Sequence, residues 1–384
     1  MRPESTRRAC VIDKEGLQCL LDRLIDAGYE VIGPVVQDYA ILYRPVDKVT
    51  SLPAGVVDEQ VAGRYRLGDI QVGGQRPLFS HVVGPDSWKR WLHPPQQQVW
   101  RAERRKGEVT FVPELQEAQP ARVLLGVRAC EVAAIRIQDR VLVEEEWPDT
   151  GYRSRREALF IIAVNCSRAG GSCFCASMGT GPEATEGFDL VLTELIDEES
   201  HRFLMVAGSE AGERHIEALP GDEPTPDDFE WAARQIAEAA NHMGREMPAD
   251  AAEVLINSLD HPHWEEVAAR CLHCANCTMV CPTCFCTSLE ERTTLDGSAT
   301  ERWRQWDSCF NEAFSYMHGG PVRKSGKARY RQWLTHKLAQ WEIQFGTSGC
   351  TGCGRCITWC PVGIDITEEV RAFSCREENK DGDG

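Results

Sequence analysis

Two cysteine runs decide the fold of this chain, and the first reads Cys271-Leu-His-Cys-Ala-Asn-Cys-Thr-Met-Val-Cys-Pro282. The second reads Cys350-Thr-Gly-Cys-Gly-Arg-Cys-Ile-Thr-Trp-Cys-Pro361. Both follow the spacing C-x2-C-x2-C-x3-C-P, in which three closely spaced thiolates surround three corners of one cubane iron–sulfur cluster. The fourth cysteine, which precedes the proline, reaches the other cluster in proteins that carry two. The runs therefore predict two 4Fe–4S clusters.

This spacing assigns four cysteines to each predicted cluster, three from one run and one from the other. Cluster 1 takes Cys271, Cys274, Cys277 and Cys360. Cluster 2 takes Cys350, Cys353, Cys356 and Cys281. Zinc also binds C-x2-C pairs, but the third cysteine of each run and the Cys-Pro ending favour iron–sulfur clusters.

The composition is that of a soluble globular protein in a reducing compartment. The chain has 384 residues, 42% hydrophobic and 26% charged, and its 18 cysteines include the two cluster motifs. We expect a cytoplasmic location, because a secreted disulfide scaffold would be much shorter. The first residues lack the apolar segment of a secretory signal, and no apolar stretch is long enough for a membrane span. A net charge of −17 argues against a nucleic-acid partner.

The N-terminal half reads as an α+β or α/β domain over residues 1–207. A helix is expected at 11–28, and residues 45–120 read as irregular, with several tryptophans in the core or on a partner surface. A further helix is expected at 131–138. Apolar runs predict the strands of a mixed sheet at 29–36, 39–43, 123–127, 159–164, 188–195 and 202–207.

Four further cysteines fall in this half. Cys130 and Cys166 follow two predicted strands, and Cys173 and Cys175 lie in the glycine-rich loop after Cys166. Ligands collect beyond the C-terminal ends of strands in such sheets. A third iron–sulfur cluster held by these four is one hypothesis, although their spacing is not a standard one. Inert buried thiols or a redox-active thiol pair remain open alternatives.

The C-terminal half reads as an α-helical, ferredoxin-like domain that carries both clusters. A polar linker is expected at 208–226, and Thr225 caps a helix that extends to about residue 243. Helices are also expected at 251–259 and 263–270. The dicluster domain covers 227–375 and a disordered tail covers 376–384.

An insert at 282–349 separates the two runs and is too long to be a bare connection. It is expected to form two helices, the first with Trp303, Trp306, Phe310, Phe314 and Met317 and the second with Tyr330, Trp333, Leu334, Lys337, Leu338 and Trp341. Its basic core either offsets the negative charge of the clusters or is a solvated face, and it comprises Arg323, Lys324, Lys327, Arg329 and Arg331. Packing roles are expected for Cys284, Cys286 and Cys309.

No catalytic constellation is visible in the sequence. There is no Ser-His-Asp or paired-carboxylate arrangement, and the glycine-rich stretch at 179–182 lacks a nucleotide-binding pattern. Clusters without substrate chemistry indicate an electron relay, which needs a donor and an acceptor on other chains. The chain is therefore expected to be a non-catalytic subunit of an oxidoreductase complex.

Motifs along nearly the whole chain carry a family resemblance. They include Gly63-Arg-Tyr-Arg-Leu67, Gly84-Pro-Asp-Ser-Trp-Lys89, Gly126-Val-Arg-Ala-Cys-Glu131, Cys173-Phe-Cys-Ala-Ser-Met-Gly-Thr-Gly-Pro182 and Cys281-Pro-Thr-Cys-Phe-Cys286. In these the chain resembles the beta subunits of cytoplasmic sulfhydrogenases, which are group 3b NAD(P)-linked [NiFe] hydrogenases. It is also similar to the A subunit of anaerobic sulfite reductase. One departure is Ala129-Cys-Glu131, where Pro-Cys-Asp is expected.

The resemblance implies particular partners. A flavin subunit, the NAD(P)-binding diaphorase, would stand on one side, and a small iron–sulfur subunit and the large [NiFe] subunit on the other. In the sulfite reductase alternative, the chain feeds a sirohaem subunit. A third alternative, from another class, is an iron–sulfur redox sensor or assembly protein, against which the eight regularly spaced ligands argue.

Overall fold

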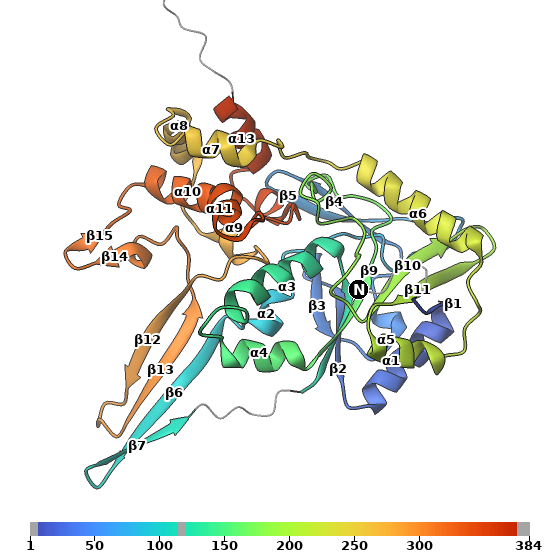
Figure 1. Cartoon of the computed structure of the whole chain (residues 1–384), viewed down its shortest axis with the longest axis horizontal. Helices are drawn as coiled ribbons and strands as arrows, with labels where there is room; N and C mark the ends of the chain where they lie inside the picture. The colour runs from blue at the N-terminus through green and yellow to red at the C-terminus, as the bar shows by residue number, and fades with distance from the viewer. Residues whose placement is uncertain (1–6, 114–119, 375–384) are drawn as a thin grey trace, which may run out of the picture.

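A mixed seven-stranded sheet forms the N-terminal part of the computed structural model, which describes residues 7–113 and 120–374 (Figure 1). The strand order is β1-β11-β10-β9-β8-β2-β3. Strands β2, β8, β9 and β10 are parallel to one another, and β1, β3 and β11 pair antiparallel. The strands are β1 (Ala9–Ile12), β2 (Glu30–Gln37), β3 (Ala40–Pro45), β8 (Arg122–Val127), β9 (Leu159–Val164), β10 (Leu190–Ile196) and β11 (His201–Ala207). The predicted mixed sheet is confirmed.

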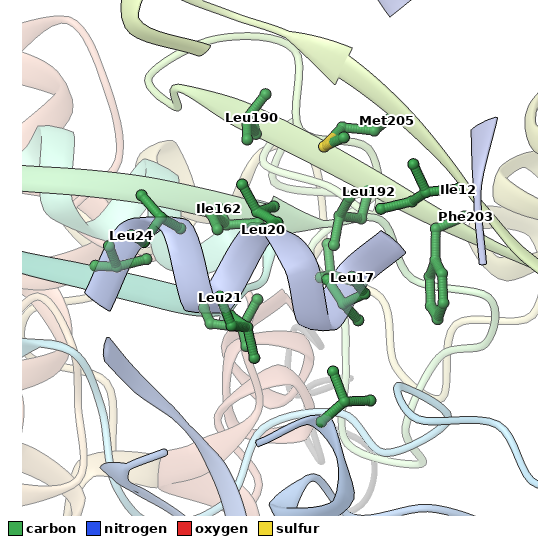
Figure 2. Close-up of a cluster of buried hydrophobic side chains, with 14 of the residues drawn as sticks. Ile12, Leu17, Leu20, Leu21, Leu24, Ile162, Leu190, Leu192, Phe203 and Met205 are labelled. Carbon is green, nitrogen blue, oxygen red and sulfur yellow. The ribbon is translucent and has the colours of Figure 1, made fainter. Parts of the chain in front are cut away.

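Both faces of this sheet are buried. Neighbouring residues of its central strands point to opposite faces, so each strand contributes side chains to both layers of packing. On one face, Ile162 and Leu192 pack against Leu20 and its neighbours on helix α1 (Lys14–Asp26), as Figure 2 shows. On the other face, Ile161 packs against Ile135. That face is covered by α2 (Lys89–Leu92), α3 (Ala129–Leu142) and α4 (Thr150–Glu157).

Helix α1 begins later than expected. Residues 11 and 12 belong to β1, and the side chain of Asp13 accepts a hydrogen bond from the Gly16 backbone N–H, which caps the helix start. The expected linker also needs correction, because it contains helix α5 (Glu210–Glu217), whose Ile216 is buried in the sheet core. The polar composition of 208–226 is typical of a linker, and a single apolar residue such as Ile216 is too weak a pattern to indicate a helix.

A second sheet joins the two halves of the chain, with strand order β12-β13-β6-β7. Strands β6 (Gln96–Arg105) and β7 (Glu108–Pro113) come from the N-terminal half, and β12 (Thr287–Thr293) and β13 (Ala299–Trp306) from the insert. The prediction that residues 45–120 are irregular is therefore wrong. The same segment also contains a hairpin of β4 (Val56–Val61) and β5 (Arg64–Asp69). The first expected insert helix is wrong too, because Trp303 and Trp306 lie in β13, where pairing with β6 overrides their helical spacing.

Helices dominate the rest of the C-terminal half. The first of them, α6, packs on the large sheet through Ala232, and later ones surround a second core that includes Trp264, Leu334 and Val370. The second insert helix is confirmed as α10, one π-helical turn (His336–Gln340) and α11. The Thr225 cap is confirmed as well. The helices are α6 (Pro226–Asn241), α7 (Ala251–Asn257), α8 (His263–Arg270), α9 (Asn276–Met279), α10 (Gly326–Thr335), α11 (Trp341–Phe345), α12 (Arg355–Thr358) and α13 (Ile366–Ser374).

Short elements complete the chain: the 3-10 turns Val49–Ser51 and Ala313–Ser315 and the small hairpin of β14 (Tyr316–Met317) and β15 (Gly320–Pro321). Within residues 7–113 and 120–374, no helix combines the length and apolar character that crossing a membrane requires. The tail predicted at 376–384 lies outside the described residues.

Candidate iron-sulfur sites

A first pocket brings together cysteines from both runs. Its empty space is about 420 Å³, part of it open to solvent, and the cysteines that line it are Cys271, Cys274, Cys277, Cys356 and Cys360. The chain turns between the first three because His273 and Ala275 have positive φ angles of 54° and 65°. The four cysteines predicted for cluster 1 therefore surround one pocket.

A second pocket has about 290 Å³ of empty space and is lined by Cys281, Cys350, Cys353 and Cys356. Gly352 and Gly354 have φ angles of 64° and 75°. A Cβ on Gly354 would stand only 2.3 Å from the backbone oxygen of Ser172, so only glycine lets the two loops approach this closely. The four cysteines predicted for cluster 2 thus also meet at one pocket.

The two pockets are neighbours. Cys356 lines both of them, and its thiol interacts electrostatically with that of Cys277 from the first pocket. A cluster in each would therefore lie close enough to the other to exchange electrons.

The pKa values of buried thiols in these pockets are shifted in opposite directions, because hydrogen bonds and a nearby cation outweigh burial at one of them. Burial and the neighbouring sulfur atoms raise the pKa of Cys277 and Cys356 well above its usual value, and burial raises the pKa of Cys350 to about 12. Hydrogen bonding from Cys284 and the charge of Lys337 instead hold the pKa of Cys281 well below its usual value. A bound metal deprotonates its thiol ligands outright, so it offsets the cost of gathering buried thiolates.

Lys337 is the cation of the second pocket, and the sequence reading did not single it out for this role. Its Nζ donates hydrogen bonds to Cys281 Sγ at 3.2 Å, Thr283 Oγ1 at 2.8 Å and the Gly349 carbonyl at 3.1 Å. It is only 5% exposed, and although burial lowers the pKa of a lysine, the surrounding thiolates raise the pKa of Lys337 overall. The available signal was a lysine at an apolar position of a helical pattern. The π-helical turn that carries it is a feature often found at functional sites.

Three residues that line the first pocket carry buried polar atoms without partners. Tyr330 Oη, Trp333 Nε1 and His273 Nδ1 are buried and have no hydrogen-bond partner among the described residues, and all three residues line this pocket. Inorganic sulfides and cysteine sulfurs of a cluster accept such hydrogen bonds. The thiol set and these donors fit an iron–sulfur cluster.

The basic core of the insert divides between the two expected roles. The charge of Arg329, which is 9% exposed, acts on Cys271, and that of Arg323 acts on Cys309. Arg329 also lies 3.8 Å from the Glu312 carboxylate, Lys327 forms an ion pair with Glu265, and Arg331 forms one with Asp260. Only part of the core can therefore offset cluster charge.

Cys284, Cys286 and Cys309 are half-buried beside the pockets. Cys286 and Cys309 interact with each other. Lys89, buried at 3% exposure, donates to the carbonyl of Cys284 at 3.2 Å and lies 3.9 Å from the ring centroid of Trp306. A packing role for these three cysteines stays our interpretation.

The four N-terminal cysteines also come together. Cys130 is at the start of α3, directly after β8, and Cys166 follows β9, so both lie beyond the C-terminal ends of parallel strands. The Cys130 thiol interacts electrostatically with Cys166 and Cys175, and Cys173 interacts with Cys166. Burial raises the pKa of Cys173 to about 12.

Comparisons with known proteins agree with this picture. Residues 270–364 match the family model described as a 4Fe-4S dicluster domain. The chain is 31% identical over 321 residues to sulfhydrogenase 2 subunit beta of Pyrococcus furiosus, which covers 80% of this chain and 89% of that protein. No solved structure matches the chain.

Proposed function

The chain belongs to the family of sulfhydrogenase beta subunits and has an iron–sulfur electron-transfer role, and we propose that it relays electrons inside an NAD(P)-linked [NiFe] hydrogenase. The proposal is supported by the pair of adjoining pockets, one lined by five cysteines and the other by four, with both runs contributing to each. We place the subunit in the cytoplasm, because thiol ligands persist in reducing surroundings.

The proposed ligands of cluster 1 are Cys271, Cys274, Cys277 and Cys360, and those of cluster 2 are Cys350, Cys353, Cys356 and Cys281. When bound, a 4Fe–4S cluster accepts and releases one electron at a time. The protein contributes the position and the charge around that electron. Lys337 places an ammonium group 3.2 Å from Cys281 Sγ, which favours the added negative charge of the reduced state.

The first pocket lies at the surface and the second is buried. Cys274 is exposed, whereas Cys281, Cys350 and Cys353 are buried. Leu272, beside Cys274, is 61% exposed, which is unusual for a large apolar side chain in a ligand loop. These features support exchange of electrons with a partner subunit at the first pocket.

The partners we propose follow from the family. A flavin subunit would exchange hydride with NAD(P)H on one side of this chain. On the other side stand the small iron–sulfur subunit and the large [NiFe] subunit, where hydrogen is formed or consumed. This chain then transfers single electrons between two reaction sites that lie on other subunits.

Anaerobic purification of the full chain with its native partners tests the proposal. Expected are nickel and flavin in the same complex, together with hydrogen-dependent reduction of NAD(P). Sirohaem absorbance in place of nickel would contradict the hydrogenase role and favour the sulfite reductase alternative. Clusters that disassemble on oxidation, without any partner, would favour a sensor.

A matched pair of cysteine variants sharpens this test within the complex. Cys274→Ser should abolish hydrogen-dependent NAD(P) reduction, while hydrogen oxidation by a dye that reacts at the nickel subunit continues. Cys19→Ser, on α1 and far from both runs, should change neither. Undiminished NAD(P) reduction in Cys274→Ser would contradict a relay through the first pocket.

A further inference from the structure

Parallel strands bring the first two N-terminal cysteines to one edge of the large sheet. β8 and β9 are paired in parallel register, and Cys130 and Cys166 each follow the end of one of them. The two cysteines are 36 positions apart in sequence, yet their thiols interact electrostatically. The sheet itself therefore positions this pair.

The loop after Cys166 delivers the other two cysteines to the same place. A Cβ on Gly170 would stand 3.2 Å from Cys173 Sγ, and one on Gly181 would stand 3.1 Å from Cys175 Sγ and 3.6 Å from the Cys130 backbone nitrogen. The absence of side chains at these glycines lets the loop wrap closely around the thiols. The Cys175 thiol interacts with Cys166 and Cys173.

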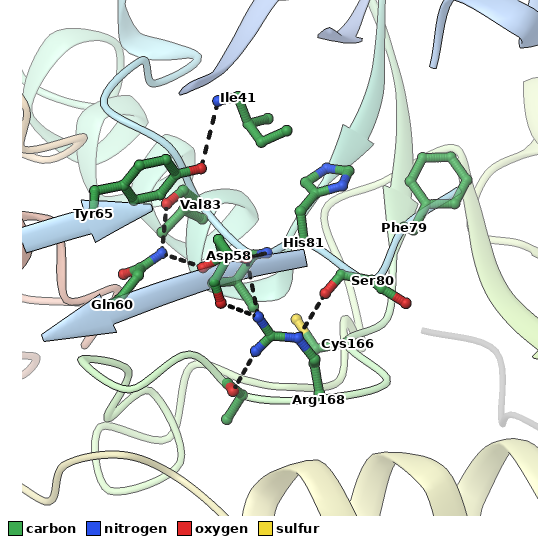
Figure 3. Close-up of polar contacts among 12 residues, drawn as sticks. Ile41, Asp58, Gln60, Tyr65, Phe79, Ser80, His81, Val83, Cys166 and Arg168 are labelled. Carbon is green, nitrogen blue, oxygen red and sulfur yellow. Dashed lines mark hydrogen bonds and ion pairs between the residues drawn. The ribbon is translucent and has the colours of Figure 1, made fainter. Parts of the chain in front are cut away.

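A polar network fixes the start of this loop, as Figure 3 shows beside Cys166. Arg168 donates to the Ser80 carbonyl at 2.8 Å and to the Asp58 carboxylate at 3.2 Å. Asp58 also accepts from the Val82 backbone N–H at 2.7 Å. Cys166 thus stands on a loop anchored to a different part of the chain, as a preorganised ligand requires.

Buried positive charge surrounds the four thiols. Arg128 is 2% exposed, donates to the Phe79 carbonyl at 2.8 Å and approaches Cys166 Sγ at 3.9 Å, and it has no carboxylate ion pair among the described residues. Arg355 is 1% exposed and its charge acts on Cys130 and Cys353. It pairs with Glu131, but its Nη1 has no hydrogen-bond partner in the described part of the chain. The unpartnered Nη1 of Arg355 is a buried donor that an anion at this site would satisfy.

We propose that Cys130, Cys166, Cys173 and Cys175 bind a third iron–sulfur cluster, whose negative charge is balanced by Arg128 and Arg355. Four thiolates around iron supply the anion that these two arginines face. The described histidine, cysteine and acidic residues include no group of three or more placed to hold a single metal ion. A cubane differs in this respect, because each thiolate binds a separate iron atom and the four sulfur atoms stand farther apart.

The third site adjoins the second pocket. Cys353, which lines that pocket, packs against Cys130 and Cys175. The three sites thus follow one another from the surface at Cys274 to the end of the large sheet. The third cluster would extend the proposed relay, and its role in electron transfer rests on that proposed function. Its presence does not depend on which complex the chain joins.

Iron and acid-labile sulfide in the anaerobically purified full chain give the direct test. Three cubanes require about 12 iron atoms per chain, whereas two require about 8. A count near 12, with three reducible cluster signals in the electron paramagnetic resonance spectrum, supports the third site. A count near 8 with two signals overturns it. A sirohaem partner would contradict the proposed function and leave a count near 12 in support of this site.

Cysteine variants assign the iron to its ligands. Cys173→Ser should lower the count from about 12 to about 8 and remove one signal, and Cys173→Ser with Cys274→Ser should lower it to about 4. The matched control is Cys10→Ala, which replaces another buried thiol, in β1, and should leave the iron unchanged. An unchanged count in Cys173→Ser overturns the assignment. Should that variant fail to accumulate, the number of cluster species in the Mössbauer spectrum of the unaltered chain decides alone.

Discussion

The large sheet and the cysteine-rich half are held together by different means. In the sheet, both faces pack against helices, and fully buried residues such as Leu20 and Leu192 fill the space between. In the cysteine-rich half, two pockets interrupt the core, and the helices within the ligand runs, α9 and α12, have four residues each. Helices this short are unstable alone. We therefore expect the sheet to fold from its apolar residues alone, whereas the ligand loops of the other half need their metal.

Removal of iron should have the largest effect and should separate the two halves. We expect backbone amides of residues 271–281 and 350–360 to lose nearly all hydrogen-exchange protection in the iron-free chain, because the ligand loops lose what holds them. Amides of β8 and β9 should keep theirs. Hydrogen exchange with mass spectrometry on both forms measures this. Equal protection of the ligand loops in the two forms would contradict their dependence on iron.

Leu20→Ala should show the reverse pattern. Leu20 is fully buried between α1 and the sheet, so its truncation should lower the free energy of unfolding of this half by about 3 kcal/mol. Iron content should stay the same. Chemical denaturation and iron analysis give the two readings, and Ile25→Ala, on the same helix at 37% exposure, is the control with little expected effect. Loss of iron in Leu20→Ala would show that the halves are not independent.

Lys337→Met tests the charge that the structure places beside the second pocket. Loss of the ammonium group disfavours the reduced, more negative cluster, so the reduction potential of cluster 2 should fall by roughly 50–100 mV. Lys327→Met, where the lysine pairs with Glu265, should leave both potentials nearly unchanged. A redox titration monitored by electron paramagnetic resonance checks this. A potential that rises or stays constant in Lys337→Met would contradict the proposed role.

Thr225→Ala should have the smallest effect. Helix α6 follows the large sheet in sequence but packs on it, with Ala232 against Leu195 and Leu204, so the effect should be confined to the sheet. Thr225 and Asp228 form a capping box at the start of α6, with Thr225 Oγ1 donating to Asp228 at 2.7 Å. Loss of the cap should cost about 1 kcal/mol. Thermal unfolding measures it, with Thr225→Ser as the control that keeps the hydroxyl. Equal destabilisation by both variants would show that the hydroxyl is not the cause.

The sequence predicts those features whose cause is local. The cysteine runs are recognisable because their ligands must turn around one cubane within a few residues, and the buried strands β8 and β9 are recognisable as continuous apolar runs. The pairing of β13 with β6 joins residues far apart in the chain, so no local pattern reveals it. The same holds for Lys337, whose partner Cys281 is 56 residues away.

The two cysteine runs are proposed to share their clusters crosswise, each giving three ligands to one cluster and one to the other. Anomalous diffraction at the iron absorption edge, on crystals of the anaerobic chain, locates the iron atoms and their ligands directly. We expect one cubane bonded to Cys360 together with Cys271, Cys274 and Cys277, and another bonded to Cys281 together with Cys350, Cys353 and Cys356. Cubanes each held by the four cysteines of a single run, or sites that contain zinc instead of iron, would contradict it.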